Sequence, residues 1–236
     1  ISFDELKQAY CKTLNGVFPF TAKAEGEARA FNYTVKNTYK CKTKVAKPAV
    51  FIPVFPGTNC EDDTAKKFRQ AGANPQIVVM RNRSPQNIKE TIEAFEKAIY
   101  NSQIIAFPGG FSGGDEPDGS GKFIATTFRN PVIAQAVFDL LYKRDGLILG
   151  ICNGFQALVK LGLLPYGKIE AQTPWSPTLT FNNINKHVSV ISRIRVSSNL
   201  SPWLSGVKVG DVFNVPISHG EGRFVASVEE LTKLAE

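Results

Sequence analysis

Leu147-Ile148-Leu149-Gly150-Ile151-Cys152-Asn153-Gly154-Phe155-Gln156 is the stretch that decides the fold of this 236-residue chain. The apolar run from Leu147 to Ile151 predicts a strand buried in a parallel sheet. Glycines two residues before and two residues after Cys152 permit a tight turn, and the apolar residues that follow recur at helical spacing. Strand, G-x-C-x-G and helix form the thiol version of a nucleophile elbow, in which the N-terminus of the helix favours a thiolate. The alternative is a structural cysteine buried at the end of a core strand.

The composition is that of a soluble globular protein, with 43% hydrophobic and 21% charged residues. No apolar stretch approaches the roughly 20 residues of a membrane span, and the N-terminus lacks the pattern of a signal peptide. The cysteines form no C-x-x-C pair and no cluster with the two histidines, so neither a disulfide framework nor a metal site is expected. These features predict a protein of the reducing cytoplasm. The four cysteines are Cys11, Cys41, Cys60 and Cys152.

The net charge of +7 invites a nucleic-acid interpretation, but the positive charge is concentrated in one early segment that has no aromatic binding motif. We therefore expect a solvated linker, or a docking surface for an acidic partner, rather than a nucleic-acid site. Residues 1–47 are expected to be the tail of a preceding domain followed by this basic linker, and residues 48–236 the main domain. The positive charge of this segment comes from five lysines, namely Lys36, Lys40, Lys42, Lys44 and Lys47.

Alternating strands and helices in the main domain predict the α/β class, with a doubly wound, mostly parallel sheet flanked by helices. Strands are expected over residues 49–55, 77–80, 104–107 and 147–151, with helices over 60–71, 88–100 and 131–144. After Leu179 the pattern changes to shorter β-like runs, which we expect to form an antiparallel extension at the edge of the sheet. These runs cover residues 188–191, 194–196 and 212–217.

A catalytic thiol needs a base, a group that orients the base, and an oxyanion hole. His219 is the candidate base, and Glu221 lies two residues on, so that both side chains of an extended segment point the same way. His187 has no carboxylate close in sequence and is expected to have a structural or substrate-edge role. The Asn153 N–H and an N–H from the Gly109-Gly110 turn are the candidate oxyanion donors.

Four motifs together resemble class I (triad) glutamine amidotransferases, and more narrowly the glutaminase domains of phosphoribosylformylglycinamidine synthases, a family of purine biosynthesis. The Cys-Asn-Gly-x-Gln and His-Gly-Glu-Gly-Arg-Phe pair is specific to this branch. Gly113 departs from the family pattern, in which many members have Tyr. The motifs are Phe55-Pro56-Gly57-Thr58-Asn59-Cys60-Glu61, Pro108-Gly109-Gly110-Phe111-Ser112-x-Gly114-Asp115, Gly150-x-Cys152-Asn153-Gly154-x-Gln156 and Ser218-His219-Gly220-Glu221-Gly222-Arg223-Phe224.

The resemblance implies that Cys152 attacks the carboxamide of L-glutamine to form a γ-glutamyl thioester, with His219 as base and acid and Glu221 orienting it. Gln156 and the Gly109-Gly110 backbone would line the pocket, and the stretch from Thr180 to Ser189 would close over the α-groups of glutamine.

The resemblance also implies a flavodoxin-like fold and a C-terminal piece of a single-chain synthase, truncated soon after the His-Gly-Glu motif. The ammonia would serve the ATP-dependent amidation of formylglycinamide ribonucleotide. No cofactor is implied for this piece, because ATP and magnesium would bind in the synthase portion, which is the expected partner. Two alternatives stay open: another cysteine hydrolase on the same fold, or a non-catalytic docking or regulatory domain.

Overall fold

The computed structural model describes residues 1–22, 30–35, 40–41, 43–113 and 121–235. These residues form two compact units. One unit combines residues 1–40, 180–223 and 235, and the other combines residues 41–179 and 224–234. The chain therefore leaves the larger unit at about residue 180 and returns to it after residue 223.

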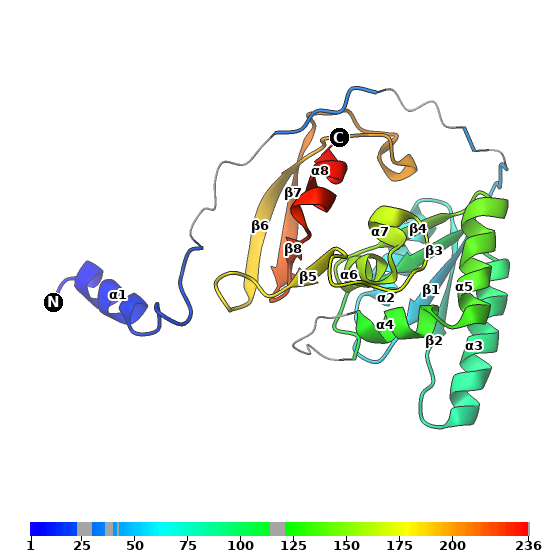
Figure 1. The fold of residues 1–236 in the computed structure, drawn as a ribbon, viewed down its shortest axis with the longest axis horizontal. Helices are drawn as coiled ribbons and strands as arrows, with labels where there is room; N and C mark the ends of the chain where they lie inside the picture. The colour runs from blue at the N-terminus through cyan, green and yellow to red at the C-terminus, as the bar shows by residue number, and fades with distance from the viewer. Residues whose placement is uncertain (23–29, 36–39, 42, 114–120, 236) are drawn as a thin grey trace. The chain divides into compact units, whose positions relative to one another are not determined.

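The larger unit is built on a parallel sheet whose strand order is β2-β1-β3-β4 (Figure 1). Its strands are β1 (Ala49–Val54), β2 (Asn74–Val79), β3 (Ile104–Phe107) and β4 (Leu147–Gly150). This order, with a switch between β1 and β3, is that of flavodoxin-like doubly wound sheets, which bind ligands at the carboxyl ends of the strands. The predicted fold class is confirmed, and each of the four predicted strands is present.

Helices cover both faces of this sheet because successive side chains of its central strand point to opposite sides. Phe51 belongs to the core cluster that packs against α3, α4, α5 and α6, whereas Val50 and Ile52 belong to the cluster packed against α2. All three side chains are fully buried, which explains the nearly continuous apolar sequence of β1. The helices of this unit are α2 (Glu61–Gln70), α3 (Pro85–Tyr100), α4 (Lys122–Phe128), α5 (Pro131–Phe138), α6 (Asn153–Leu161), α7 (Leu163–Tyr166) and α8 (Val228–Ala235).

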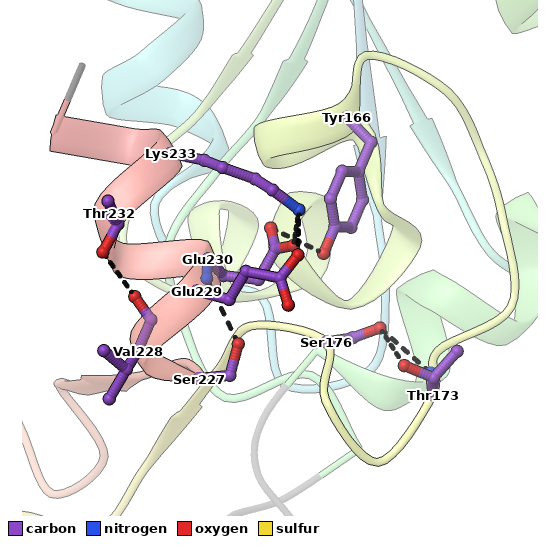
Figure 2. Close-up of polar contacts among 9 residues, drawn as sticks. All are labelled: Tyr166, Thr173, Ser176, Ser227, Val228, Glu229, Glu230, Thr232 and Lys233. Atoms are coloured by element: carbon purple, nitrogen blue, oxygen red, sulfur yellow. Dashed lines mark hydrogen bonds and ion pairs between the residues drawn. The ribbon is translucent and has the colours of Figure 1, made fainter.

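A hydrogen bond joins α8 to α7, and ion pairs lie within α8 itself (Figure 2). The Tyr166 hydroxyl donates to Glu230 Oε2 at 3.2 Å, and Lys233 pairs with Glu229 and Glu230 at 2.8 and 3.2 Å. Burial raises the pKa of the Tyr166 phenol, and the charge of Glu230 adds to that shift. The phenol therefore stays protonated and keeps its donor role through the neutral and mildly basic pH range.

The smaller unit contains α1 (Phe3–Lys12), β6 (Val188–Arg195), the 3₁₀ turn η2 (Pro202–Leu204) and β7 (Val212–His219). Ser2 and Glu5 form a capping box at the start of α1. The β6 and β7 strands pair antiparallel along their whole length, with Val188 opposite His219 and Arg195 opposite Val212.

The antiparallel character of this region is confirmed, but its predicted place at the edge of the parallel sheet is wrong. The β6 and β7 strands form a separate two-stranded sheet, and β5 (Thr178–Thr180) pairs with β8 (Arg223–Val225) in another. The two predicted runs 188–191 and 194–196 are one strand, because Ser192 and Arg193 continue the pairing with β7. Polar residues do not end a strand that is exposed on one side.

Other boundaries also differ from the expectation. The helix predicted over residues 131–144 is α5 followed by a π-helical turn, η1 (Asp139–Lys143). The sequence does not predict helices α4, α7 and α8 or strands β5 and β8. Apart from α8, these elements are short, and a short element leaves little periodic pattern in the sequence. Lys36, Lys42, Gly114 and Asp115 lie outside the described residues.

No helix in the described ranges is long and apolar enough to cross a membrane. Within the same ranges, no group of three or more His, Cys, Asp or Glu side chains is placed to hold a metal ion.

The hydrogen bonds of Arg144 at the end of α3 allow a test of their contribution to the stability of the fold. Its guanidinium donates to the carbonyls of Ile99 (2.8 Å) and Tyr100 (2.8 Å) in the last turn of α3 and of Ser102 (3.0 Å) just beyond it. Arg144→Met keeps the aliphatic stem but removes these charged hydrogen bonds, so the free energy of unfolding should fall by about 2–3 kcal/mol.

The matched control is Lys143→Met, which removes an exposed ion pair with Asp139 and should leave stability nearly unchanged. Urea unfolding of both variants checks the comparison. Equal midpoints for the two variants would contradict the proposed role of Arg144.

Candidate active site

Cys152 lies on a strained turn between a strand and a helix. The β4 strand ends at Gly150, α6 begins at Asn153, and Cys152 between them has φ +52° and ψ −108°. A non-glycine residue in such a backbone conformation costs on the order of 1–3 kcal/mol. The side chain is exposed, as required of a nucleophile. This geometry excludes the alternative of a structural cysteine buried at the end of a core strand.

The two glycines beside Cys152 are required by close packing. A methyl group at Gly154 would overlap the carbonyl oxygen of Phe107, and one at Gly150 would lie 2.7 Å from the carbonyl oxygen of Gly154. Real Cβ atoms do not approach backbone oxygen this closely, so only glycine lets α6 start against the end of β3. The G-x-C-x-G pattern therefore encodes a steric condition for the turn.

The loop that follows β3 packs directly against Cys152. The missing Cβ of Gly109 would lie 3.3 Å from Cys152 Cβ. Gly110, at φ +133°, bridges to Thr58, and the Phe111 N–H donates to the carbonyl of Gly57 at 2.8 Å. The loops after β1 and β3 are thereby joined at the carboxyl edge of the sheet, next to the thiol.

The side chain of Asn153 ties this loop to the start of α6. Its Oδ1 accepts from the Ser112 N–H at 3.2 Å, and its Nδ2 donates to Gln156 Oε1 at 3.1 Å. Asn153 is 1% exposed and Gln156 8% exposed. The sequence indicates the backbone of Asn153 as a candidate oxyanion donor but does not reveal these hydrogen bonds of its side chain.

A second thiol lies close to Cys152. The Sγ of Cys60 is 3.7 Å from the missing Cβ of Gly109, the same point that lies 3.3 Å from Cys152 Cβ. Burial raises the pKa of the Cys60 thiol, and nearby negative charges add to the shift, first that of Cys152. Cys60 is therefore a protonated neighbour of the nucleophile at neutral pH.

The histidine and carboxylate candidates belong to the smaller unit. His219 is the last residue of β7, and its Nδ1 lies 3.0 Å from Oδ1 of Asn182. Glu221 is 4% exposed, an unusual burial for a carboxylate. His187 instead contacts the Ser218 hydroxyl through Nε2 at 2.8 Å. Asn182 is a partner of His219 that the sequence alone does not indicate, since the family resemblance places it only in the stretch expected to close over the substrate.

The structure thus groups the predicted residues into two sets. Gly109, Gly110, Asn153 and Gln156 surround the Cys152 turn in the larger unit. His219 and Glu221 lie in the loop after β7 in the smaller unit. A strained thiol with a glycine loop against it is the architecture of an acyl-transfer site.

Residues 47–236 match the family model described as a CobB/CobQ-like glutamine amidotransferase domain, and the chain belongs to this family. The family resemblance inferred from the four motifs is confirmed.

Several relatives with similar sequences are subunits of one amidotransferase, phosphoribosylformylglycinamidine synthase. The chain is 35% identical to the phosphoribosylformylglycinamidine synthase subunit PurQ of Methanococcus maripaludis, over 80% of this chain and 64% of the relative. It is 34% identical to the PurQ subunits of Dehalococcoides mccartyi (80% and 68% covered) and Campylobacter jejuni (79% and 70% covered). The alignment thus reaches about two thirds of the length of these relatives.

A solved structure shows the same fold. The structure of PurLQS from Thermotoga maritima matches with a TM-score of 0.55 and 28% identity, covering 77% of this chain and 70% of that one.

The shared position of the two thiols leads to a pH-dependent prediction. A negative charge at Cys152 disfavours the Cys60 thiolate, so Cys152→Ala should lower the pKa of Cys60 while burial still holds it above the ordinary value. The pH at which alkylation of Cys60 by iodoacetamide is half-maximal should move down. Peptide mass spectrometry over a pH series measures this midpoint.

Cys41→Ala is the control, because Cys41 is exposed and is not among the causes of the Cys60 shift. An unchanged Cys60 midpoint in Cys152→Ala would contradict the electrostatic coupling of the two thiols.

Proposed function

We propose that the chain hydrolyses L-glutamine to glutamate and ammonia, with Cys152 as the nucleophile. The observation that carries the proposal is the exposed Cys152 on its strained turn, with Gly109 packed against it. Membership of the glutamine amidotransferase family supports the choice of substrate, and favours it over that of another cysteine hydrolase on the same fold.

The reaction follows from thiol chemistry at a carboxamide. His219 takes the proton of the Cys152 thiol. The thiolate adds to the carboxamide carbon, an S–C bond forms, and the carbonyl electron pair moves onto oxygen. The C–N bond then breaks, and ammonia leaves with a proton supplied by His219. Water adds to the γ-glutamyl thioester, gives a proton to His219, and the S–C bond breaks to release glutamate and the thiolate.

Each remaining predicted residue has a role in this scheme. The backbone N–H of Asn153, at the start of α6, and one from the Gly109-Gly110 turn stabilise the oxyanion. Glu221 stabilises the imidazolium that forms on His219. Gln156 supports the pocket through its bond to Asn153.

We further propose that the ammonia is delivered to a synthase portion that aminates formylglycinamide ribonucleotide in purine biosynthesis. The names of the PurQ relatives and of the PurLQS structure support this partner. ATP and magnesium would bind there. We also propose that residues 1–47 are the tail of a synthase portion followed by a basic linker, and the start of the family match at residue 47 supports a boundary near that residue.

A diazo-ketone analogue of glutamine tests the proposal, because it alkylates a thiol only where the glutamine side chain is bound. We expect peptide mapping to find the label on Cys152, with glutamine protecting. His219→Ala should slow the labelling by about 10²- to 10⁴-fold, the usual contribution of a general base.

His187→Ala is the comparison and should slow labelling much less than His219→Ala, because the His187 ring contacts the Ser218 hydroxyl and is not the proposed base. Label on Cys60 or Cys41 in place of Cys152 would contradict the proposal. Failure of the folded chain to label, both alone and with the synthase portion added, would favour a non-catalytic docking domain.

A further inference from the structure

Asn182 is a buried amide at the centre of the loop that carries His219. It follows β5, and its own backbone N–H donates to the carbonyl of Gly220 at 2.9 Å. The residue is 8% exposed. A buried amide is costly unless its donors and acceptors are paired, and in Asn182 both ends are paired.

The surrounding groups fix which end of the amide is the oxygen. The side-chain nitrogen of Asn182 donates to two backbone carbonyls, those of Lys186 at 3.0 Å and His219 at 2.9 Å. The oxygen accepts from the backbone N–H of Gly222 at 3.2 Å. Flipping the amide would set its oxygen against two carbonyls and its NH₂ against an N–H, with the loss of all three bonds.

This fixed orientation determines the tautomer of the histidine. Asn182 Oδ1 can only accept, and it lies 3.0 Å from Nδ1 of His219. The proton of the neutral imidazole must therefore be on Nδ1, which leaves the lone pair on Nε2 free to take a proton. Free imidazole side chains in water favour the opposite tautomer, so the contact imposes a choice.

Packing supports the same position of the ring. A methyl group at Gly222 would overlap Cε1 and Nδ1 of His219. The absence of a side chain at Gly222 thus lets its backbone approach both the imidazole and Asn182. The glycine after Glu221 in the His-Gly-Glu-Gly motif has this steric basis.

We infer that Asn182 is a positioning residue that holds His219 in the Nδ1–H tautomer, so that Nε2 serves as the base in the proposed reaction. The inference rests on the proposed function for its catalytic meaning, and on the hydrogen bonds alone for the tautomer. Asn182 thereby selects the tautomer of the neutral imidazole, whereas the charge of Glu221 stabilises the protonated imidazolium.

The first test is the ¹⁵N spectrum of the whole chain, with its histidines labelled at both ring nitrogens. His187→Gln removes the signals of the other histidine and assigns those of His219. At a pH at which His219 is neutral, we expect a protonated-type signal at Nδ1 and an unprotonated one at Nε2. The reverse pattern in the wild-type protein would overturn the inference, and no variant of Asn182 is needed to see it.

The second test replaces the amide with a side chain of similar size that cannot accept. Asn182→Leu should shift His219 toward the Nε2–H tautomer and slow diazo-ketone labelling of Cys152 by about tenfold, less than the loss of a general base. Asn214→Ala is the control, because its side chain is exposed on β7 and lies outside the stretch from Thr180 to Ser189.

The outcomes separate this inference from the proposed function. Wild-type labelling of Cys152 together with an Nε2–H tautomer would leave the glutaminase proposal standing and overturn the role of Asn182. An Nδ1–H tautomer of His219 without labelling of Cys152 would support the role of Asn182 in setting the tautomer and contradict the glutaminase proposal. An unchanged tautomer in a folded Asn182→Leu protein would also overturn the role of Asn182.

Discussion

The strained backbone at Cys152 is the constraint on which the rest of the larger unit depends. A residue with φ +52° keeps that conformation only if the elements on both sides are fixed. Here β4 is held in the parallel sheet beside β3, and α6 is held against the end of β3 through the bare backbone of Gly154. The buried side chain of Asn153 adds a bond to the loop after β3. Tight packing at the carboxyl edge thus sustains an exposed thiol in a conformation that an isolated peptide would not adopt.

The sequence predicts this part of the molecule well because short-range patterns carry the information. Apolar runs such as Leu147–Ile151 mark buried parallel strands, and glycine spacing marks the turn. The antiparallel region was placed wrongly because its pairing is between distant segments. Nothing in the local pattern of Val188–Arg195 distinguishes a strand added to the parallel sheet from one that pairs only with β7.

The sequence does not predict the contact between Asn182 and His219 for a related reason. Spacing points to Glu221 as the partner of His219, because the two lie on the same segment. The hydrogen bond at Nδ1 instead comes from a residue 37 positions away, and only the fold of the loop after β5 brings it there. The pairing of Val188 with His219 at the ends of β6 and β7 keeps the two loops together. In each set a buried amide joins neighbouring segments: Asn153 links the start of α6 to the loop after β3, and Asn182 links the loop after β5 to the residues that end β7 and follow it.

The central claim is the proposal that Cys152 forms a γ-glutamyl thioester with glutamine. Rapid acid quenching during turnover of radiolabelled glutamine, with the synthase portion present, tests it because acid preserves a thioester. The account predicts label on the Cys152 peptide of the wild-type protein and no label in Cys152→Ala. Label on the Cys60 peptide, or glutamate release by folded Cys152→Ala at the wild-type rate, would contradict it.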